Sequence, residues 1–167
     1  GASTAGGTLT ARAGGTITLS GSLSAGVASD SIVLEAGANF DNSGAFALNA
    51  PATGRWLVYS TNPALDNRGG LGYSFKQYNA PIGTVTAASG PGVNGFLYSV
   101  APTITPSLTG TTTKTYDGTT TVSLSAANYA TTGAIDGDTV LLNNPTTGTY
   151  VAKNVGTSKS VSTTVSI

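Results

Sequence analysis

Apolar and polar residues alternate in several short stretches of the first part of the chain, and glycine or asparagine separates these stretches. The stretches cover residues 7–11, 15–21, 30–37 and 44–50. In each of them two apolar side chains fall on one face and small polar side chains on the other, which is the pattern of a β-strand with one buried face. The central residues Ile17, Ile32 and Phe46 recur at nearly equal spacing along the sequence.

A short repeat of this kind favours a parallel β-helix, in which each strand stacks on its counterpart in the next coil around a column of aliphatic side chains. The alternative is a meander of antiparallel hairpins in a sandwich, because Asn42-Ser43-Gly44 could form a hairpin turn. No window of the chain shows a sustained helical period with caps, so we predict an all-β protein without a long helix.

Bulky rings are concentrated between residues 56 and 98, which contain seven of the twelve aromatic residues. They are Trp56, Tyr59, Tyr73, Phe75, Tyr78, Phe96 and Tyr98. The open end of a solenoid exposes strand edges and an apolar column, and both need a cover. We therefore predict that residues 1–100 form the C-terminal coils of a parallel β-helix and that the ring-rich block forms an aromatic cap.

The remainder of the chain has a different organisation. Residues 101–112 contain two prolines and are predicted to be an extended linker. Residues 113–167 have strand signals at 114–116, 120–125, 138–142, 149–153 and 158–167, with turn residues between them. This spacing predicts a small all-β module, either β-grasp or sandwich-like. No turn follows the last strand, so we expect the module to be truncated.

Composition narrows the classes of function. Charged residues make up 8% of the chain, against about 25% in an ordinary soluble domain, and seven basic residues balance seven acidic ones. No net field attracts nucleic acid, and no long apolar run indicates a membrane-spanning helix. Histidine and cysteine are absent, which removes Ser-His-Asp and Cys-His catalysis and most zinc sites. We expect no cofactor, and a monomeric internal fragment of a larger protein without a signal peptide.

Three blocks of sequence follow one another in an informative order. The β-helical coils come first, residues 54–60, 75–80 and 95–99 come next, and Lys114-Thr115-Tyr116-Asp117-Gly118-Thr119-Thr120-Thr121 with 137–140 and 149–156 comes last. This order resembles the end of the β-helix and the YDG-type repeat of filamentous-haemagglutinin-like adhesins of bacteria, and it covers nearly the whole chain. The sequence departs from that family by lacking its amino-terminal secretion domain and by ending before the usual last strands of the repeat.

The resemblance implies a two-partner-secretion adhesin, which passes unfolded through an outer-membrane transporter and is then secreted or displayed on the bacterial cell surface. On this basis we expect a structural stalk that carries attachment to host cells, other bacteria or biofilm matrix. Its partners would be extracellular polysaccharide or surface glycans, besides the transporter. The absence of cysteine fits such a route, because a chain that passes through a pore unfolded cannot be locked by disulfides.

A carbohydrate-binding module is the alternative function. Sugar rings present apolar C–H faces that lie on aromatic rings, while amide groups bond the hydroxyls. The residues of the cap region with this chemistry are Trp56, Tyr73, Phe75, Gln77, Tyr78, Asn79 and Tyr98. The competing interpretation is that these rings face inward and cover the end of the column.

The acidic residues give no convincing catalytic or metal site. Asp30 and Glu35 flank one strand at an odd separation, which predicts opposite faces and a poor acid/base pair. Asp117-Gly118 is predicted to be a turn with Tyr116 packed beneath it. Asp136-Gly137-Asp138 is predicted to be a solvated turn rather than a calcium loop, because it lacks EF-hand spacing. We therefore expect no enzyme.

Overall fold

The computed structural model describes residues 1–167 and consists of two compact units, Gly1–Pro102 and Thr103–Ile167. We call them unit 1 and unit 2. Strands account for the regular structure, and two short 3-10 turns, η1 (Pro63–Leu65) and η2 (Ala126–Asn128), are the only helical elements. The prediction of an all-β protein is thus confirmed. None of the helical segments has the length and apolar character needed to cross a membrane.

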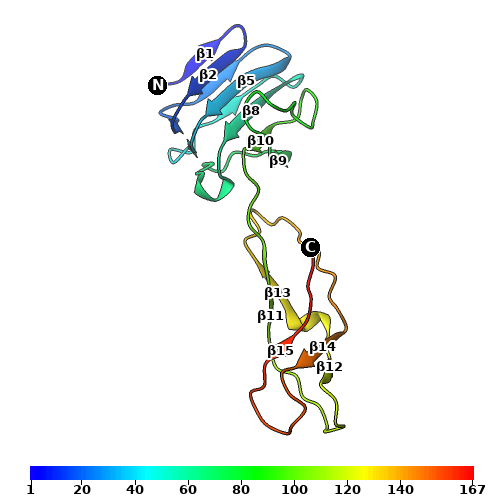
Figure 1. Ribbon diagram of the computed structural model, residues 1–167. Helices are drawn as coiled ribbons and strands as arrows, with labels where there is room; N and C mark the ends of the chain where they lie inside the picture. The colour runs from blue at the N-terminus through cyan, green and yellow to red at the C-terminus, as the bar shows by residue number, and fades with distance from the viewer. The chain divides into compact units, whose positions relative to one another are not determined.

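Unit 1 is built from three parallel sheets that run along a stack of coils (Figure 1). The first sheet contains β1 (Ser3–Ala5), β4 (Leu23–Ala25) and β7 (Leu48–Asn49). The main sheet contains, in spatial order, β2 (Leu9–Ala13), β5 (Ser29–Ala36), β8 (Gly54–Ser60), β10 (Gly95–Tyr98) and β9 (Phe75–Gln77). The third contains β3 (Ile17–Thr18) and β6 (Phe40–Asp41). The first two coils each add one strand to all three sheets, and later strands extend the first and main sheets in the same parallel register. This confirms the solenoid and excludes the hairpin meander.

One coil is longer than the repeat read in the sequence. Leu9 pairs with Ile32, and Ile32 pairs with Trp56, so each coil extends well beyond the spacing between Ile17 and Ile32. Ile17 pairs with Phe40 instead, and Phe46 lies outside the strands. The predicted repeat was wrong because three strands of one coil share the same alternation. Residues at equal spacing in the sequence, such as Ile17 and Ile32, therefore lie in different sheets.

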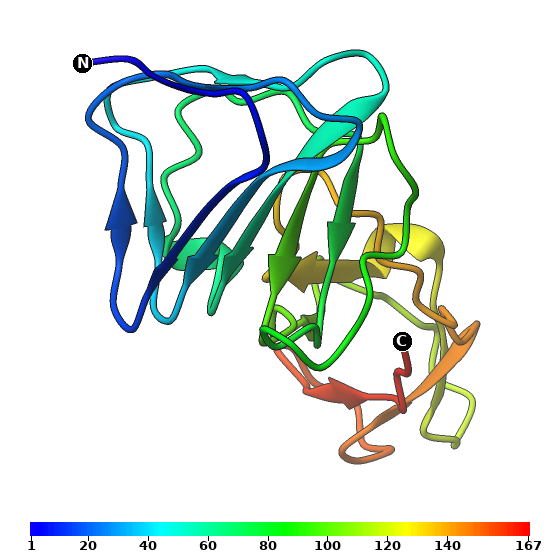
Figure 2. The same ribbon diagram turned by 90° about the horizontal axis from the view of Figure 1, so that it is seen from above.

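Side chains from successive coils form one column inside unit 1. One row of the main sheet runs from Ala11 through Leu34 and Val58 to Phe96, each paired with the next. Leu34, Val58 and Phe96 are 0–1% exposed. The row widens from alanine to phenylalanine along the stack, so the same column that is aliphatic in the first coils becomes aromatic at its end. Figure 2 shows these strands of unit 1 side by side.

The last two strands of the main sheet are out of sequence order. After β8 the chain passes through η1, forms β9, and returns as β10 between β8 and β9, pairing in parallel with both. On the outer face of the sheet, Leu57 and Leu97 are buried with Ala80. Phe75 and Ala87 pack against the same cluster. The ring-rich block thus continues the stack and covers both faces of its final strands.

Asn42 forms a corner of the solenoid rather than the first residue of a hairpin. Its side chain is buried, its amide oxygen accepts from the backbone N–H of Phe46, and its amide nitrogen donates to the carbonyls of Phe46 and Arg68. Gly69, with φ of 59°, approaches Asn42 so closely that a Cβ atom would clash with it. A buried polar side chain therefore ties one coil to the next with all its groups bonded.

Unit 2 consists of two small antiparallel sheets (Figure 1). One pairs β11 (Thr105–Leu108) with β13 (Tyr129–Thr132), and the other contains β12 (Thr121–Ser123), β14 (Thr147–Tyr150) and β15 (Val161–Ser162). Val122 and Leu124 are its buried apolar side chains. Tyrosine hydroxyls supplement this small core, since Tyr129 donates to the carbonyl of Pro145 and Tyr150 to that of Thr112.

The strands of unit 2 correct several predictions. Strand β11 lies inside residues 101–112, which were predicted to be a linker. Pro106 is tolerated there because β11 has a neighbour on one side only. Residues 114–116 and 138–142, predicted to be strands, are irregular, whereas β13 was missed. Short polar strands of threonine and alanine differ little from loops in composition, so their pairing depends on partners distant in sequence.

Replacing Phe96 with alanine should lower the free energy of unfolding of unit 1 by about 3–5 kcal/mol, because it opens a cavity where the column turns aromatic. Trp56 is the only tryptophan and its ring lies 5.2 Å from that of Phe96, so its fluorescence reports this unfolding in urea. Leu65→Ala, at a side chain 64% exposed, is the control and should change stability by less than about 0.5 kcal/mol. Similar losses in both variants would contradict the assigned role of Phe96.

Candidate functional site

The end of the column in unit 1 is an aromatic cluster centred on Phe96. Its ring centroid lies 5.2 Å from that of Trp56 and 5.3 Å from that of Tyr73, and both meet it edge-on. Tyr98 lies parallel to it at 6.1 Å, and Phe40 is tilted at 6.0 Å. Edge-on and parallel pairs contribute about 0.5–1.5 kcal/mol each beyond the burial of their surface. Phe96 therefore contacts rings from three other segments of unit 1, in addition to Tyr98 of its own strand.

Arg68 places a cation against this cluster. Its guanidinium carbon lies 5.6 Å from the ring centroid of Phe96, 5.8 Å from that of Tyr98 and 6.0 Å from that of Tyr73. The Nε group donates to the Tyr98 hydroxyl at 2.8 Å, and a terminal nitrogen donates to the carbonyl of Pro63 at 3.0 Å. A cation on an aromatic face is worth about 0.5–2 kcal/mol, depending on how far it is desolvated. The apolar column thus ends in a polar, charged group.

Asp66 fastens the loop after η1 to the preceding coil. One carboxylate oxygen accepts from the backbone N–H of Phe40 at 2.8 Å, and the other accepts from the Ser60 hydroxyl at 2.6 Å. Burial raises the pKa of Asp66 above its ordinary 3.8, while the bonds from Ser60 and Phe40 and the positive charge of Arg68 oppose the rise. Both oxygens are occupied by bonds within unit 1, which is the arrangement of a structural clasp.

The seven residues predicted to bind carbohydrate do not share one exposed surface. Trp56 and Tyr98 are 2% and 0% exposed, and both belong to the core cluster. Gln77 is bonded to the neighbouring loop, because its oxygen accepts from Ala88 N–H at 2.7 Å and its nitrogen donates to the Thr86 carbonyl at 3.3 Å. Tyr73, Phe75 and Tyr78 are half-buried, and Asn79 is exposed. Most of the set therefore serves the packing of unit 1.

Asp30 and Glu35 lie on the same face of β5, contrary to the prediction. A β-bulge shifts the register between Asp30 and Ile32, so Ser31 and Ile32 are both buried and the alternation changes phase. Burial raises the pKa of Tyr59, and the negative charges of Asp30 and Glu35 add to that rise. An odd or even separation in sequence predicts which face of a strand a side chain lies on only where the strand pairing is regular. Nothing in the amino-acid composition indicates this bulge.

The shared face does not give the two carboxylates the geometry of a glycosidase. Asp30 is paired with Arg55, Oδ1 to Nε at 2.5 Å, and Glu35 is paired with Arg12. The strand between them separates the two acids by roughly 15 Å, taking about 3.3 Å per residue and allowing for the bulge. Glycoside hydrolysis uses carboxylates about 5–10 Å apart. Each of these acids instead neutralises an arginine on the outside of the sheet.

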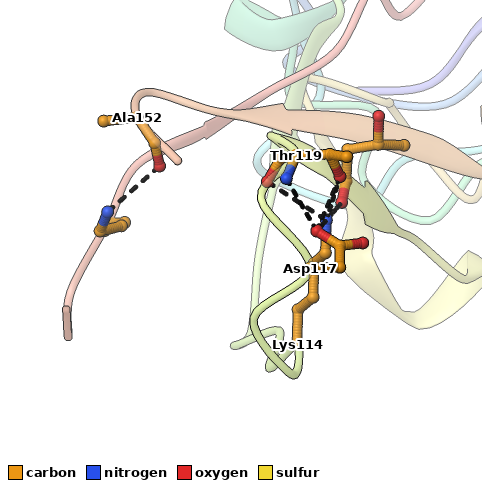
Figure 3. A network of polar contacts seen from close by, with 6 residues as sticks. Lys114, Asp117, Thr119 and Ala152 are labelled. Carbon is orange, nitrogen blue, oxygen red and sulfur yellow. Dashed lines mark hydrogen bonds and ion pairs between the residues drawn. The ribbon is translucent and has the colours of Figure 1, made fainter. Parts of the chain in front are cut away.

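The Tyr116-Asp117-Gly118 segment is a turn clamped by Lys114 (Figure 3). Gly118 has φ of 75°, as predicted, but Tyr116 is 62% exposed and does not pack beneath the turn. The Lys114 ammonium lies 2.7 Å from Asp117 Oδ1 and donates to the Thr119 hydroxyl at 2.6 Å. The Lys114 contact, followed by hydrogen bonds from Thr119, lowers the pKa of Asp117 from 3.8 to about 2.

Asp136-Gly137-Asp138 forms a turn, as its sequence predicts. Asp136 and Gly137 have φ of 50° and 72°, and the Asp138 N–H donates to the carbonyl of Ile135 at 3.0 Å. Positive φ at both central residues is the requirement of a type I′ turn, which Asp-Gly favours. No group of three acidic, histidine or cysteine residues in residues 1–167 could hold a metal ion. The backbone conformation of Asp136-Gly137 therefore accounts for the turn.

The residues that organise these clusters were not singled out from the sequence. Arg68 and Asp66 lie in an irregular segment, and Lys114 was assigned to a strand. The sequence signal that could have identified them is the small number of charged residues, which make up only 8% of the chain. In such a chain each charged side chain is unusual, and burying even part of one requires specific partners.

One comparison with known proteins gives a match. A family model described as the YDG domain matches residues 100–167. No curated protein and no solved structure matches the chain. The match covers unit 2 and the last residues of unit 1, so it characterises the antiparallel module and leaves the solenoid without a matched relative.

Asp66→Ala should lower the free energy of unfolding of unit 1 by roughly 1–3 kcal/mol, since it leaves the Phe40 N–H without an acceptor. Asp66→Asn keeps an oxygen for Phe40 and a nitrogen that can donate to the Ser60 hydroxyl, so it should cost clearly less. Urea unfolding followed by Trp56 fluorescence distinguishes the two variants. Equal destabilisation would show that the charge, rather than the two hydrogen bonds, fastens the loop.

Asp117 should also make unit 2 less stable in acid. Its pKa is lower in the folded chain than the ordinary value, so its contribution is complete above about pH 4 and disappears as the pH falls toward about 2. A carboxyl NMR titration of the full chain should give a pKa of about 2. Lys114→Gln should move that pKa toward 3.8, whereas Lys153→Gln, which removes a lysine that makes no bond to Asp117, should not. No movement with Lys114→Gln would contradict the clamp.

Proposed function

We propose that the chain is a structural, stalk-forming part of a secreted bacterial surface adhesin of the filamentous-haemagglutinin-like class. In this role it carries attachment to host cells, other bacteria or biofilm matrix. The observation that supports the proposal best is the coil-by-coil parallel register of unit 1, in which strands of successive coils pair in parallel along three sheets. A scaffold of this type grows by nearest-neighbour stacking and spans distance with few kinds of contact.

The order of the two units is the second support. The aromatic end of a solenoid is followed directly by a segment that matches the YDG domain, which is the order expected from the resemblance to these adhesins. The chain also has no cysteine, so passage through an outer-membrane transporter in an unfolded state meets no disulfide. Nearest-neighbour stacking then allows folding to proceed outside the cell as each coil emerges.

The charged groups of unit 1 favour a structural role over catalysis. Asp66 accepts hydrogen bonds from the Phe40 N–H of the preceding coil and from the Ser60 hydroxyl at the end of β8. The outer carboxylates Asp30 and Glu35 each neutralise an arginine. The buried rings of Trp56 and Tyr98 leave little of the predicted sugar surface available. Packing accounts for these side chains without a bound ligand, which is what a scaffold requires.

The proposal places the chain outside the cell, which can be tested directly. Antibodies raised against the purified chain should label intact bacteria that produce it. If the protein is released, the same antibodies should detect it in the filtered culture medium. External protease should remove the surface label without permeabilisation. Cells whose protein lacks both units should attach less to host cells or to biofilm matrix. Labelling that appears only after the cells are permeabilised would contradict the proposal.

A further inference from the structure

The three lysines of unit 2 line a single groove. The groove has a volume of about 570 Å³ and lies between two segments of the unit, 108–119 on one wall and 150–161 on the other. Lys114 belongs to the first wall, and Lys153 and Lys159 belong to the second. Figure 3 shows Lys114 with its partners Asp117 and Thr119, and Ala152 on the other segment. The positive side chains of the unit are thus gathered at one place.

Most of this charge is not neutralised inside the unit. Asp117 is the only acidic residue that lines the groove, and its partner is Lys114. Lys159 donates to the carbonyls of Ala152 and Asn154, which are neutral, and Lys153 is exposed and forms no ion pair. Two ammonium groups on the same wall therefore remain without a counter-charge. The other two acidic residues of the unit belong to the 135–138 turn, which does not line the groove.

The remaining lining has the chemistry of a sugar site. Tyr116 presents a ring that is 62% exposed on the Lys114 wall, and Val155 is 83% exposed on the opposite wall. Seven threonines also line the groove, among them Thr112, Thr115 and Thr157. An exposed tyrosine offers a face for the C–H side of a pyranose, and hydroxyls bond its polar edge. Exposed ring, hydroxyls and cations without a counter-charge occur together only here among the features of unit 2.

We propose that this groove binds an acidic polysaccharide, with the ring of Tyr116 under a sugar and the ammonium groups of Lys153 and Lys159 beside carboxylates of uronic-acid residues. An acidic peptide fits less well, because the exposed apolar side chains stand on the two walls and do not form the anchoring pocket that peptide recognition uses. The inference adds a ligand to a module that the proposed function treats as structural, so its failure leaves that function standing.

Calorimetric titration of the full chain with a short oligogalacturonate at low ionic strength should show saturable binding that weakens as salt is added. A neutral oligosaccharide of equal length should not bind. Lys153→Gln removes one exposed charge and should weaken binding about three- to fivefold, and Tyr116→Ala should weaken it about two- to tenfold. Arg12→Gln is the matched control, because it removes the same charge from unit 1, and it should leave the affinity unchanged.

Several results would overturn the proposal. These are absence of saturable binding, equal binding of the neutral sugar, or an equal loss in Lys153→Gln and Arg12→Gln, which would indicate attraction by net charge alone. Tighter binding of a sulfated oligosaccharide would contradict the assignment to carboxylates. Tighter binding of an oligoglutamate would identify an acidic peptide as the partner. An unchanged amide NMR spectrum outside the groove confirms that each variant remains folded.

Discussion

The packing of Phe96 against rings from neighbouring coils is the interaction on which unit 1 depends. A parallel solenoid can add coils without limit, so its apolar column has to end in a way that does not expose it. Here the column widens until a phenylalanine fills it, and the Arg68 guanidinium then lies against that ring and the adjoining tyrosines. Aromatic rings suit this position because one face packs on apolar side chains and another accepts a cation.

The same constraint explains the unusual strand order and the fate of the predicted binding residues. Strand β10 carries Phe96 and Tyr98 and enters between β8 and β9, so the chain has to pass beyond the end of the stack and return. The excursion supplies Asp66, Arg68 and Phe75, which hold the final strands on both faces. Several aromatic rings that the sequence offers as ligand contacts are instead packed at the end of the column. Aromatic side chains of this type can stack on sugar rings, but here they lie in the core and stabilise its packing.

Unit 2 solves a different problem, because it buries few apolar side chains and its strands are short. Polar contacts replace part of the missing core: the Lys114 clamp shapes the Tyr116-Asp117-Gly118 turn, and tyrosine hydroxyls reach backbone carbonyls across the unit. Extended segments without a covering layer leave a groove between them. A scaffold of solenoid type and a small module with an open, positively charged groove are thus combined in one chain of nearly neutral composition.

Local sequence is enough to predict the all-β class, the column of alternating apolar residues, the position of the ring-rich block at the end of that column, and the turns at Asp117-Gly118 and Asp136-Gly137. These features rest on local alternation and on the backbone freedom of particular residues, which neighbours in sequence decide. The three-dimensional structure was needed to establish the coil length, the bulge that brings Asp30 and Glu35 to one face, and the pairing of β11 with β13. The structure also shows that Trp56 and Tyr98 are buried while Tyr116 is exposed. Each of these depends on which strand lies beside which, and strands of similar alternation are interchangeable until distant partners select among them.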